Sequence, residues 1–272
     1  MAFFTDQIQT SVEISARPSR IVSLVPSQTE LLYALGLEDE VIGITKFCVH
    51  PQEWFRKKTR IGGTKNIAID RIAALQPDLI IANKEENVKE QVEALKTIAP
   101  VWTSDVNTLS DACAMIGQLG TITQKEEKAA NIIQKIEQGF AQLNIDFGAN
   151  SAKSCVYLIW KDPYMTIGGD TFIHDMLNYC RFSNLFASSK RYPVTTINEL
   201  QALGPDIILL SSEPYPFSGK HIDTLQKMLP NSQIELVDGE MFSWYGSRLV
   251  QAPAYFSGLL NRINSSSTSA KS

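Results

Sequence analysis

The sequence predicts an α/β protein made of two Rossmann-like lobes with central parallel sheets, joined by one long α-helix. Short apolar runs alternate with helical stretches along most of the 272 residues, a pattern typical of parallel sheets. The chain also contains a duplicated segment: RIAALQPDLII at 71–81 and ELQALGPDIIL at 199–209 are identical at five of eleven positions. In each copy an amphipathic helix ends before a proline, and an aspartate then leads into a buried strand. The third observation is a single long helical stretch between the copies.

Strands are predicted where β-branched apolar runs are bounded by polar residues. They fall at 21–25, 41–45, 79–83 and 101–104 in the first half, and at 155–160, 207–212 and 234–238 in the second. Two helices have recognisable ends. Ser27-x-x-Glu30 has the pattern of a capping box, with Gly36 as the terminating residue, and a second-half helix is expected from about Thr171 to Cys180.

The stretch between the copies predicts a linking helix over 122–147, because Thr123-x-x-Glu126 has the capping-box pattern and apolar residues follow at helical spacing. A helix of about 20 residues spans roughly 30 Å, enough to join two lobes. The expected domains are an N-terminal extension at 1–19, a lobe at 20–121, the linking helix, a second lobe at 148–264, and a disordered tail at 265–272. The tail, SSSTSAKS, has nothing to bury.

Composition argues against several kinds of partner. The net charge of -4, with both signs scattered along the chain, leaves no basic stripe for nucleic acid or anionic lipid. The four cysteines lie far apart without a C-x-x-C pair, which predicts reduced thiols and neither a zinc ribbon nor a disulfide scaffold. We expect no membrane insertion, because no window of about 18 apolar residues occurs. The printed N-terminus also lacks a basic start followed by an unbroken apolar core, the pattern of an export signal.

Four segments together resemble the class III substrate-binding proteins of ABC importers, in which one helix joins two lobes, and in particular their cobalamin- and iron-complex-binding branch. They are RIVSLVPSQTELLYALG, GGTKNIAIDRIAALQPDLIIANKEEN, the linking helix, and DGEMFSWYGSRL near the end. The resemblance covers nearly the whole chain. It implies a non-enzymatic protein that holds a metal-bearing small molecule between the lobes and passes it to a membrane permease.

The resemblance implies a corrinoid such as cobalamin as the leading ligand, with haem or a ferric siderophore as the alternative and a bare metal ion as the weakest candidate. We expect a monomer with no intrinsic cofactor beyond this cobalt- or iron-containing chelate. The resemblance implies a periplasmic or cell-envelope location, and the cytoplasm is the alternative because the printed N-terminus lacks the pattern of an export signal. A chelatase-like metal-inserting enzyme is the alternative from another class, because fold does not determine function. It has little support, since the sequence has no G-x-S-x-G, phosphate-binding Gly-rich loop or H-E-x-x-H.

In doubly wound lobes the ligand crevice lies beyond the carboxyl ends of the strands. Six segments are candidates for this position: 25–28, 46–51, 62–66, 160–169, 190–193 and 241–248. The candidate ligand-binding residues are Lys46, His50, Gly63, Thr64, Lys65, Trp160, Tyr164, Arg191, Tyr192, Trp244, Tyr245 and Arg248. Rings would stack on a macrocycle, cations would meet anionic or carbonyl edges, and Gly62-Gly63 would allow close approach of the backbone. For each aromatic residue, packing in the core or a loop is the competing interpretation.

Among the polar candidates, His50 is chemically the most versatile. A neutral imidazole two positions from Cys48 can ligate cobalt, iron or zinc as an axial group, whereas the alternative is a hydrogen-bonded loop histidine before Pro51. The other histidines, His174 and His221, lie outside any ligand-spaced motif.

Two acids, Asp70 and Glu199, open the matched helices of the duplicated segment. In the resembled family one acid per lobe pairs with transporter arginines, which implies a docking role for both. When the two copies are aligned on the Pro-Asp joint, Asp70 matches Asn198, so Glu199 lies one residue after the position that corresponds to Asp70. The competing interpretation is local, because an acid in a first helical turn favours the helix dipole. Glu85 and Glu86 are expected to be exposed alternatives.

Overall fold

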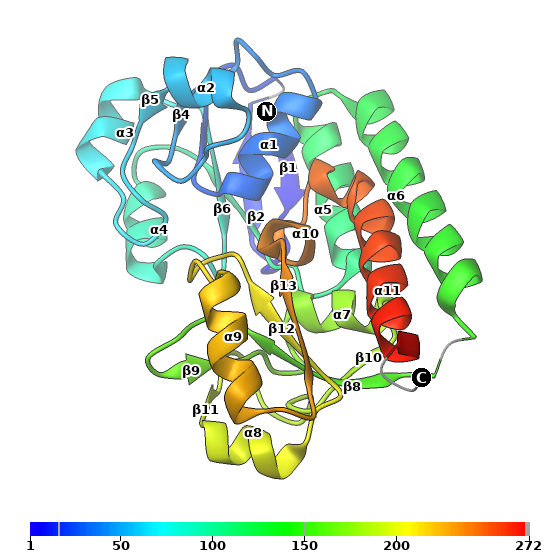
Figure 1. Cartoon of the computed structure of the whole chain (residues 1–272). Coiled ribbons are helices and arrows are strands. Elements are labelled where there is room, and N and C mark those ends of the chain that lie inside the picture. The colour runs from blue at the N-terminus through cyan, green and yellow to red at the C-terminus, as the bar shows by residue number, and fades with distance from the viewer. Residues whose placement is uncertain (16, 150, 270–272) are drawn as a thin grey trace. The chain divides into compact units, whose positions relative to one another are not determined.

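The computed structural model describes residues 1–15, 17–149 and 151–269, and the chain divides into two compact units (Figure 1). The first unit contains Met1–Val106, Ser110–Lys135 and Trp244–Arg248, and the second contains the remaining described residues. Two predicted domain boundaries are therefore corrected. The extension predicted at 1–19 belongs to the first unit, and the predicted second lobe loses the segment Trp244–Arg248 to the first unit.

The first unit is built on a five-stranded sheet in which all strands are parallel. Its strands are β3 (Ile21–Ser23), β4 (Val41–Ile44), β5 (Thr59–Arg60), β6 (Leu79–Asn83) and β7 (Val101–Ser104). Their spatial order is β5-β4-β3-β6-β7, so the chain winds outward from β3 in both directions, as in a Rossmann fold. Every residue of the central strand β6 is buried, as expected of a parallel strand covered on both faces.

Helices connect these strands, and an N-terminal hairpin completes the first unit. The helices are α1 (Pro26–Ala34), α2 (Gln52–Lys57), α3 (Ile69–Leu75), α4 (Lys89–Leu95) and α5 (Leu109–Ile122). The hairpin pairs β1 (Ala2–Thr5) with β2 (Ser11–Ile14) in antiparallel register. Val12 and Ile14 are buried while their neighbours are exposed, the alternation of a strand with one face on the core.

The second unit has a four-stranded parallel sheet and a smaller antiparallel pair. The large sheet contains β8 (Lys153–Leu158), β10 (Phe182–Asn184), β12 (Ile207–Ser211) and β13 (Gln233–Val237), in the order β10-β8-β12-β13. The small sheet pairs β9 (Tyr164–Met165) with β11 (Val194–Thr195). The helices are α7 (Phe172–Tyr179), α8 (Ile197–Leu203), α9 (Gly219–Met228), α10 (Gly239–Ser243) and α11 (Ala252–Ser269), with a 3-10 turn at Ser247–Val250 assigned in part to the first unit. Figure 1 shows α9 alongside β13, which it contacts.

The aspartate of the duplicated Pro-Asp joint has the same role in both units: it accepts hydrogen bonds from residues at the start of the neighbouring strand. Asp78 accepts hydrogen bonds from the backbone N–H groups of Ser19 and Arg20 at 2.8 and 2.9 Å, just before β3. Asp206 accepts hydrogen bonds from the backbone N–H and the hydroxyl of Ser154, the second residue of β8, at 2.7 and 2.6 Å. The repeated Pro-Asp sequence is therefore a structural feature, because its aspartate fixes the register of two adjacent parallel strands.

Helix ends agree with the prediction in some places and correct it in others. Thr171 and Thr196 cap α7 and α8, each accepting from the backbone N–H three residues on. Gly36 has φ of 78°, which confirms it as the left-handed residue after α1. The predicted cap at Ser27 is wrong: α1 begins at Pro26 with Val25 as its N-cap, because proline is preorganised for the first helical position.

The long helix α6 (Glu126–Phe147) begins later than the predicted linking helix. The Thr123 hydroxyl donates to the Leu119 carbonyl at 2.6 Å, so Thr123 belongs to the end of α5 and does not cap α6. The residues of α6 divide between the two units after Lys135. Within the second unit a Cβ on Gly139 would lie 2.9 Å from Pro253, so glycine there allows α6 to approach α11 closely.

The predicted disordered tail at 265–272 is also corrected. Helix α11 continues to Ser269, so most of the serine-rich stretch is helical, and positions 270–272 lie outside the described residues. The apolar residues Phe256, Leu259 and Ile263 are buried and recur at helical spacing. This buried stripe stabilises the helix, whose backbone continues to Ser269.

Candidate functional site

The candidate residues gather mainly at the carboxyl ends of the parallel strands, unit by unit. In the first sheet the strand order reverses between β3 and β6, and the segments 24–28, which includes the start of α1, and 84–87 follow these two strands. In the second sheet β8 and β12 are neighbours, with β10 on the other side of β8. Such reversals are where open α/β sheets bind ligands. Of the six predicted segments, only 190–193 lies elsewhere, directly before β11.

The loop at 46–51 in the first unit is anchored from inside by Cys48. Its buried sulfur lies 3.1 Å from the hydroxyls of both Thr29 and Thr45. Burial raises the pKa of the Cys48 thiol, so it stays protonated and acts as an anchor. The anchored loop holds Phe47 at the surface, 52% exposed, with the Lys46 ammonium 5.0 Å from its ring.

The neighbouring turn at 62–66 needs its glycines for reasons internal to the fold. Gly62 has φ of 101°, and a Cβ there would lie 2.5 Å from the Asn66 carbonyl. A Cβ on Gly63 would lie 3.1 Å from the Phe47 ring, so the turn packs directly against the loop at 46–51.

The two residues after the glycine pair hold the turn against the loop at 84–87. The Thr64 carbonyl accepts from the Asn87 side chain at 3.0 Å. The Lys65 ammonium donates a hydrogen bond to the Glu85 backbone carbonyl. Both contacts fix the position of the turn. They involve Thr64 and Lys65, which are predicted ligand-binding residues.

Trp244 lies in the first unit, between a histidine and an arginine. Its ring is 5.6 Å from the His50 ring in an edge-on arrangement and 4.8 Å from the Arg248 guanidinium. Arg248 in turn makes a bidentate pair with Glu30 of α1, at 2.7 and 3.0 Å. Trp244 is only 7% exposed. The structure thus brings three candidate residues together and engages Arg248 internally.

Tyr245 joins the same region to the loop after β6. Its hydroxyl donates to the Glu86 carboxylate at 2.9 Å. Burial, and then the charge of Glu86, raise the pKa of the Tyr245 hydroxyl well above its ordinary value, so it remains a hydrogen-bond donor. Glu85 and Glu86 are half-buried, which corrects the expectation that they are exposed.

In the second unit Trp160 is the most accessible tryptophan of the described chain, 40% exposed. It sits on the hairpin between β8 and β9, where its carbonyl accepts from the Met165 N–H at 3.1 Å. Tyr215, from the loop after β12, packs edge-on against Trp160 with ring centroids 5.7 Å apart. Tyr164 lies on the same hairpin and is half-buried; burial chiefly raises the pKa of its hydroxyl.

The segment at 190–193 forms a paired loop with 168–170. The Arg191 carbonyl accepts from the Gly168 N–H at 2.7 Å, and the Arg191 N–H donates to Asp170 at 2.6 Å. The Arg191 side chain also pairs with Asp170, with the Nε to oxygen distance at 3.7 Å. Tyr192 follows and is half-buried. A second candidate arginine is therefore paired with an acid of its own unit.

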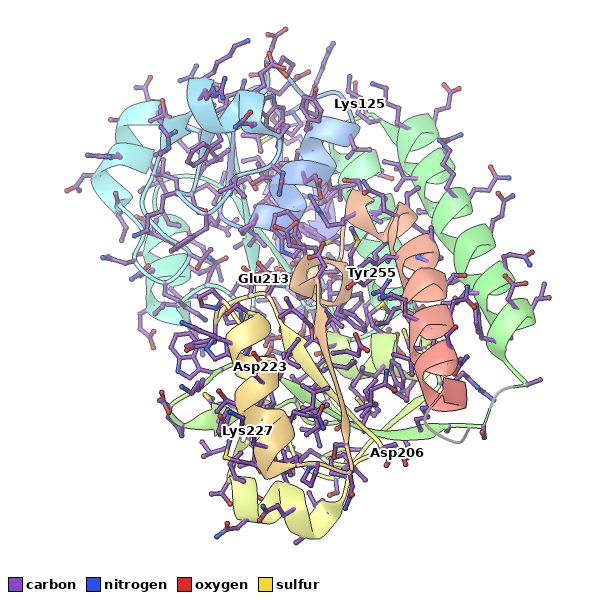
Figure 2. All side chains as sticks on the ribbon, in the orientation of Figure 1. Lys125, Asp206, Glu213, Asp223, Lys227 and Tyr255 are labelled. Carbon is purple, nitrogen blue, oxygen red and sulfur yellow. The ribbon has the colours of Figure 1, made fainter. Side chains whose placement is uncertain are left out.

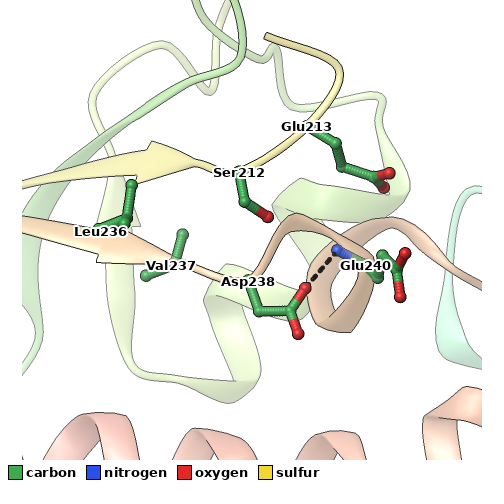
Figure 3. A pocket seen from close by; sticks show the side chains of 6 residues that line it. All are labelled: Ser212, Glu213, Leu236, Val237, Asp238 and Glu240. Atoms are coloured by element: carbon green, nitrogen blue, oxygen red, sulfur yellow. Dashed lines mark hydrogen bonds between the residues drawn. The ribbon is translucent and has the colours of Figure 1, made fainter. Parts of the chain in front are cut away.

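An acidic pocket of about 610 Å³ lies at the carboxyl ends of β12 and β13 (Figure 3). It is lined by Ser212, Glu213, Leu236, Val237, Asp238 and Glu240. Figure 2 shows Glu213 in the loop that follows β12, which also carries Tyr215. The Asp238 carboxylate accepts from the Glu240 N–H at 3.0 Å, and Glu213 accepts from the Ser243 hydroxyl at 2.9 Å. Three of the six lining side chains are therefore carboxylates.

The two predicted docking acids lie in the first turns of the two repeated helices, Asp70 at the second residue of α3 and Glu199 at the third residue of α8. Asp70 is exposed in the first turn of α3, and Glu199 is exposed in the first turn of α8. Glu199 also accepts from the Thr195 hydroxyl at 2.8 Å, and its N–H donates to the capping Thr196. Glu199 therefore has a local structural role in addition to any role at the surface.

Among residues 1–15, 17–149 and 151–269, no group of three or more histidine, cysteine or acidic residues is placed to hold a metal ion. His50 is a single candidate ligand, half-buried against Trp244, so it can at most supply one axial position to a metal that is already chelated. No helix in the described part of the chain is both long and apolar enough to cross a bilayer.

Several residues of this region were missed by sequence reasoning. Phe47 lies in the candidate segment 46–51 but is not among the predicted ligand-binding residues. Tyr215 lies outside the six candidate segments. Tyr215 follows the strand predicted at 207–212, so the rule that ligands lie beyond the carboxyl ends of strands also predicts it. The pairing of Glu30 with Arg248 and of Glu86 with Tyr245 could not be found, because the partners are distant in sequence.

Comparison with known proteins gives consistent results. A family model described as periplasmic binding protein matches residues 21–231. The vitamin B12-binding protein of Pectobacterium carotovorum is 27% identical over 260 residues, which cover 94% of this chain and 93% of that protein. YvrC of Bacillus subtilis, an uncharacterized ABC transporter substrate-binding lipoprotein, is 29% identical over 213 residues, or 75% and 67% of the two chains. The solved structure of the periplasmic heme-binding protein RhuT from Roseiflexus sp. RS-1 matches with a TM-score of 0.77 at 20% identity, covering 90% and 97%.

Proposed function

The chain belongs to the periplasmic binding protein family, and from that premise we propose that it is the substrate-binding component of an ABC importer, which captures a metal chelate and delivers it to a membrane permease. The names of the relatives support this reading, since one is a vitamin B12-binding protein and another an ABC transporter substrate-binding lipoprotein. The protein would act as a monomer, without catalysis and without a nucleic-acid partner. Its ligand would be the cobalt- or iron-containing group, and no separate cofactor is needed.

The distribution of charge supports a neutral, amide-bearing chelate such as a corrinoid. The two arginines offered for anionic groups are each paired with an acid of their own unit, Arg248 with Glu30 and Arg191 with Asp170. The pocket at the ends of β12 and β13 is lined by three carboxylates. Carboxylates accept hydrogen bonds from amide N–H groups, whereas they repel carboxylates of a ligand. Cobalamin carries peripheral amides and haem carries two propionates, so the acidic pocket is the observation that carries the choice of a corrinoid.

Exposed aromatic rings supply the apolar part of the contact. Phe47 in the first unit and Trp160 in the second are the exposed rings beside the strand ends. The ring of Trp244 is 7% exposed and already packs against His50 and Arg248. We therefore assign direct stacking to Phe47 and Trp160, and to Trp244 a role in holding His50 in place. Lys46, Tyr164, Tyr192 and the turn at Gly63–Lys65 would complete the contact.

The test compares ligands that differ in the charge of their periphery. Purified protein is titrated by calorimetry with cobalamin, haem and a ferric siderophore, and then with cobinamide and cobyrinic acid, which share the corrin ring but carry amides and carboxylates respectively. We expect heat with cobalamin, and binding of cobinamide at least tenfold tighter than that of cobyrinic acid, which corresponds to about 1.4 kcal/mol. Equal affinity for the two corrinoids, or tight binding of haem with a changed Soret band, would contradict the assignment.

The same samples distinguish capture from catalysis. A chelatase-like enzyme would convert a metal-free tetrapyrrole and free metal into product over many turnovers, whereas a binding protein takes up one ligand and stops. We expect one equivalent of ligand per chain and no product by absorption spectroscopy. Accumulation of metallated product beyond one equivalent would support the enzyme reading instead.

A further inference from the structure

The exposed Trp160 is connected to a buried histidine, His221, by a ring contact to Tyr215 and a hydrogen bond between Tyr215 and His221. His221 lies in the first turn of α9, where its Nδ1 accepts from the Ser218 N–H at 2.9 Å and closes a capping box. Because Nδ1 is an acceptor, the neutral ring carries its proton on Nε2. Nε2 faces the Tyr215 hydroxyl at 3.4 Å. The Tyr215 ring then packs against Trp160.

This series of contacts is held at each step by a second contact. The His221 ring also packs edge-on against Phe217, with centroids 5.4 Å apart, and Phe217 packs against Tyr215 at 4.8 Å. The Tyr215 N–H donates to the Ile159 carbonyl at 3.3 Å, next to Trp160. The loop after β12 and the hairpin after β8 are therefore joined through both backbone and rings.

We infer that His221 is a positioning residue, which through Tyr215 fixes the orientation of Trp160 as a platform for the ligand. The inference rests on the proposed function for the role of Trp160, but the coupling among the three rings exists without ligand. It assigns a role to a histidine and a tyrosine that no sequence motif marks. A change in the protonation state of His221 should therefore change the environment of the Trp160 ring.

The charge state of His221 supplies a direct readout of that coupling. Burial, then the charges of Lys220 and Lys161, lower the pKa of the His221 ring below its ordinary value of 6.5, against a smaller opposing effect of the Ser218 backbone. Lys161 is itself 3.5 Å from Asp162. A proton added to Nδ1 would face the Ser218 N–H, donor against donor, and would break the capping box.

The first test uses fluorine NMR on protein labelled with 5-fluorotryptophan, which gives four tryptophan signals. Trp160→Phe assigns the signal of interest. We expect that signal to shift with pH at a midpoint below 6.5, while the fully buried Trp54 and Trp102 do not follow the same titration. His221→Asn keeps an acceptor near the place of Nδ1 but cannot titrate, so the shift should disappear. Tyr215→Phe keeps the ring and removes the hydroxyl, and should reduce the shift to less than half.

The second test asks whether Tyr215 acts through Trp160. Tyr215→Phe should weaken cobalamin binding about two- to twelvefold, the cost of ordering one loosened side chain. In a Trp160→Ala background the same change should alter the affinity by less than twofold. A Trp160 signal that does not titrate, a titration unchanged in both variants, or an equal loss of affinity in both backgrounds would overturn the inference. If the wild-type protein binds no chelate, the proposed function fails, and the ligand-free NMR titration still decides the coupling.

Discussion

Removal of the Arg248 guanidinium should destabilise the first unit by about 3 kcal/mol, because it leaves a carboxylate without its partner. Arg248 makes two hydrogen bonds to Glu30, at 3.0 and 2.7 Å. The two side chains are 11% and 17% exposed. Breaking a buried ion pair costs about 3 to 5 kcal/mol, and the remaining exposure lets water solvate part of the freed charge, so the lower end applies.

The assay is urea unfolding followed by circular dichroism, with Arg248→Met, Glu30→Gln and the double variant in one cycle. Methionine keeps an unbranched stem against Trp244 while removing the charge. We expect a coupling energy of about 2 kcal/mol between the two positions. The matched control is Lys57→Met, which removes the Glu53 pair on α2 at 2.6 Å, with side chains 65% and 49% exposed. That pair is solvated, so the control should leave the unfolding midpoint unchanged.

Two outcomes would refute this reasoning. One is a midpoint for Arg248→Met no lower than that of the Lys57 control. The other is a double variant whose loss equals the sum of the two single losses, since contact between the charges requires that they be coupled.

Three further predictions concern the duplicated segment. Gln76→Gly should stabilise the protein by about 1 kcal/mol and Gly204→Gln should destabilise it by a similar amount in thermal unfolding, because both positions have positive φ, 47° and 57°, and only one carries glycine. Asp206→Asn should cost about 1 kcal/mol at neutral pH for its exposed charge-assisted hydrogen bonds. These hydrogen bonds lower the pKa of the Asp206 carboxyl below 3.8 in the folded state. The stabilisation by the Asp206 carboxylate is therefore complete above pH 3.8 and is lost as the pH falls through the folded-state pKa. The curves of unfolding free energy against pH for the variant and the wild type should converge in acid. The double change of Asp70 and Glu199 to alanine should leave ligand affinity unchanged and reduce transport in an uptake assay, and normal uptake would reject the docking proposal.

The regular elements were predictable because their signals are local. Strand β6 matches the predicted 79–83, and β7 matches 101–104. The start of α7 beside Thr171 was also predicted, since the Thr171 hydroxyl and the N–H three residues away lie within one turn. The cap at Ser27 was misplaced because proline at the next lower position starts the helix earlier. The hairpin of β1 and β2 was missed because its strands are four residues each and pair only with one another.

The alternation of apolar runs and the duplicated Pro-Asp joint determined, by sequence alone, that the chain forms two α/β units with parallel sheets. Only the tertiary structure decided which candidate side chains are available to a ligand. Arg248 pairs with a residue 218 positions away, and Tyr245 with one 159 positions away. Such partners leave no periodic trace along the chain, because the contact depends on where two distant segments are carried by their sheets and not on the residues beside them. The sequence could therefore propose arginines for the anionic or carbonyl edges of a ligand, whereas only the structure shows that both arginines are paired with acids.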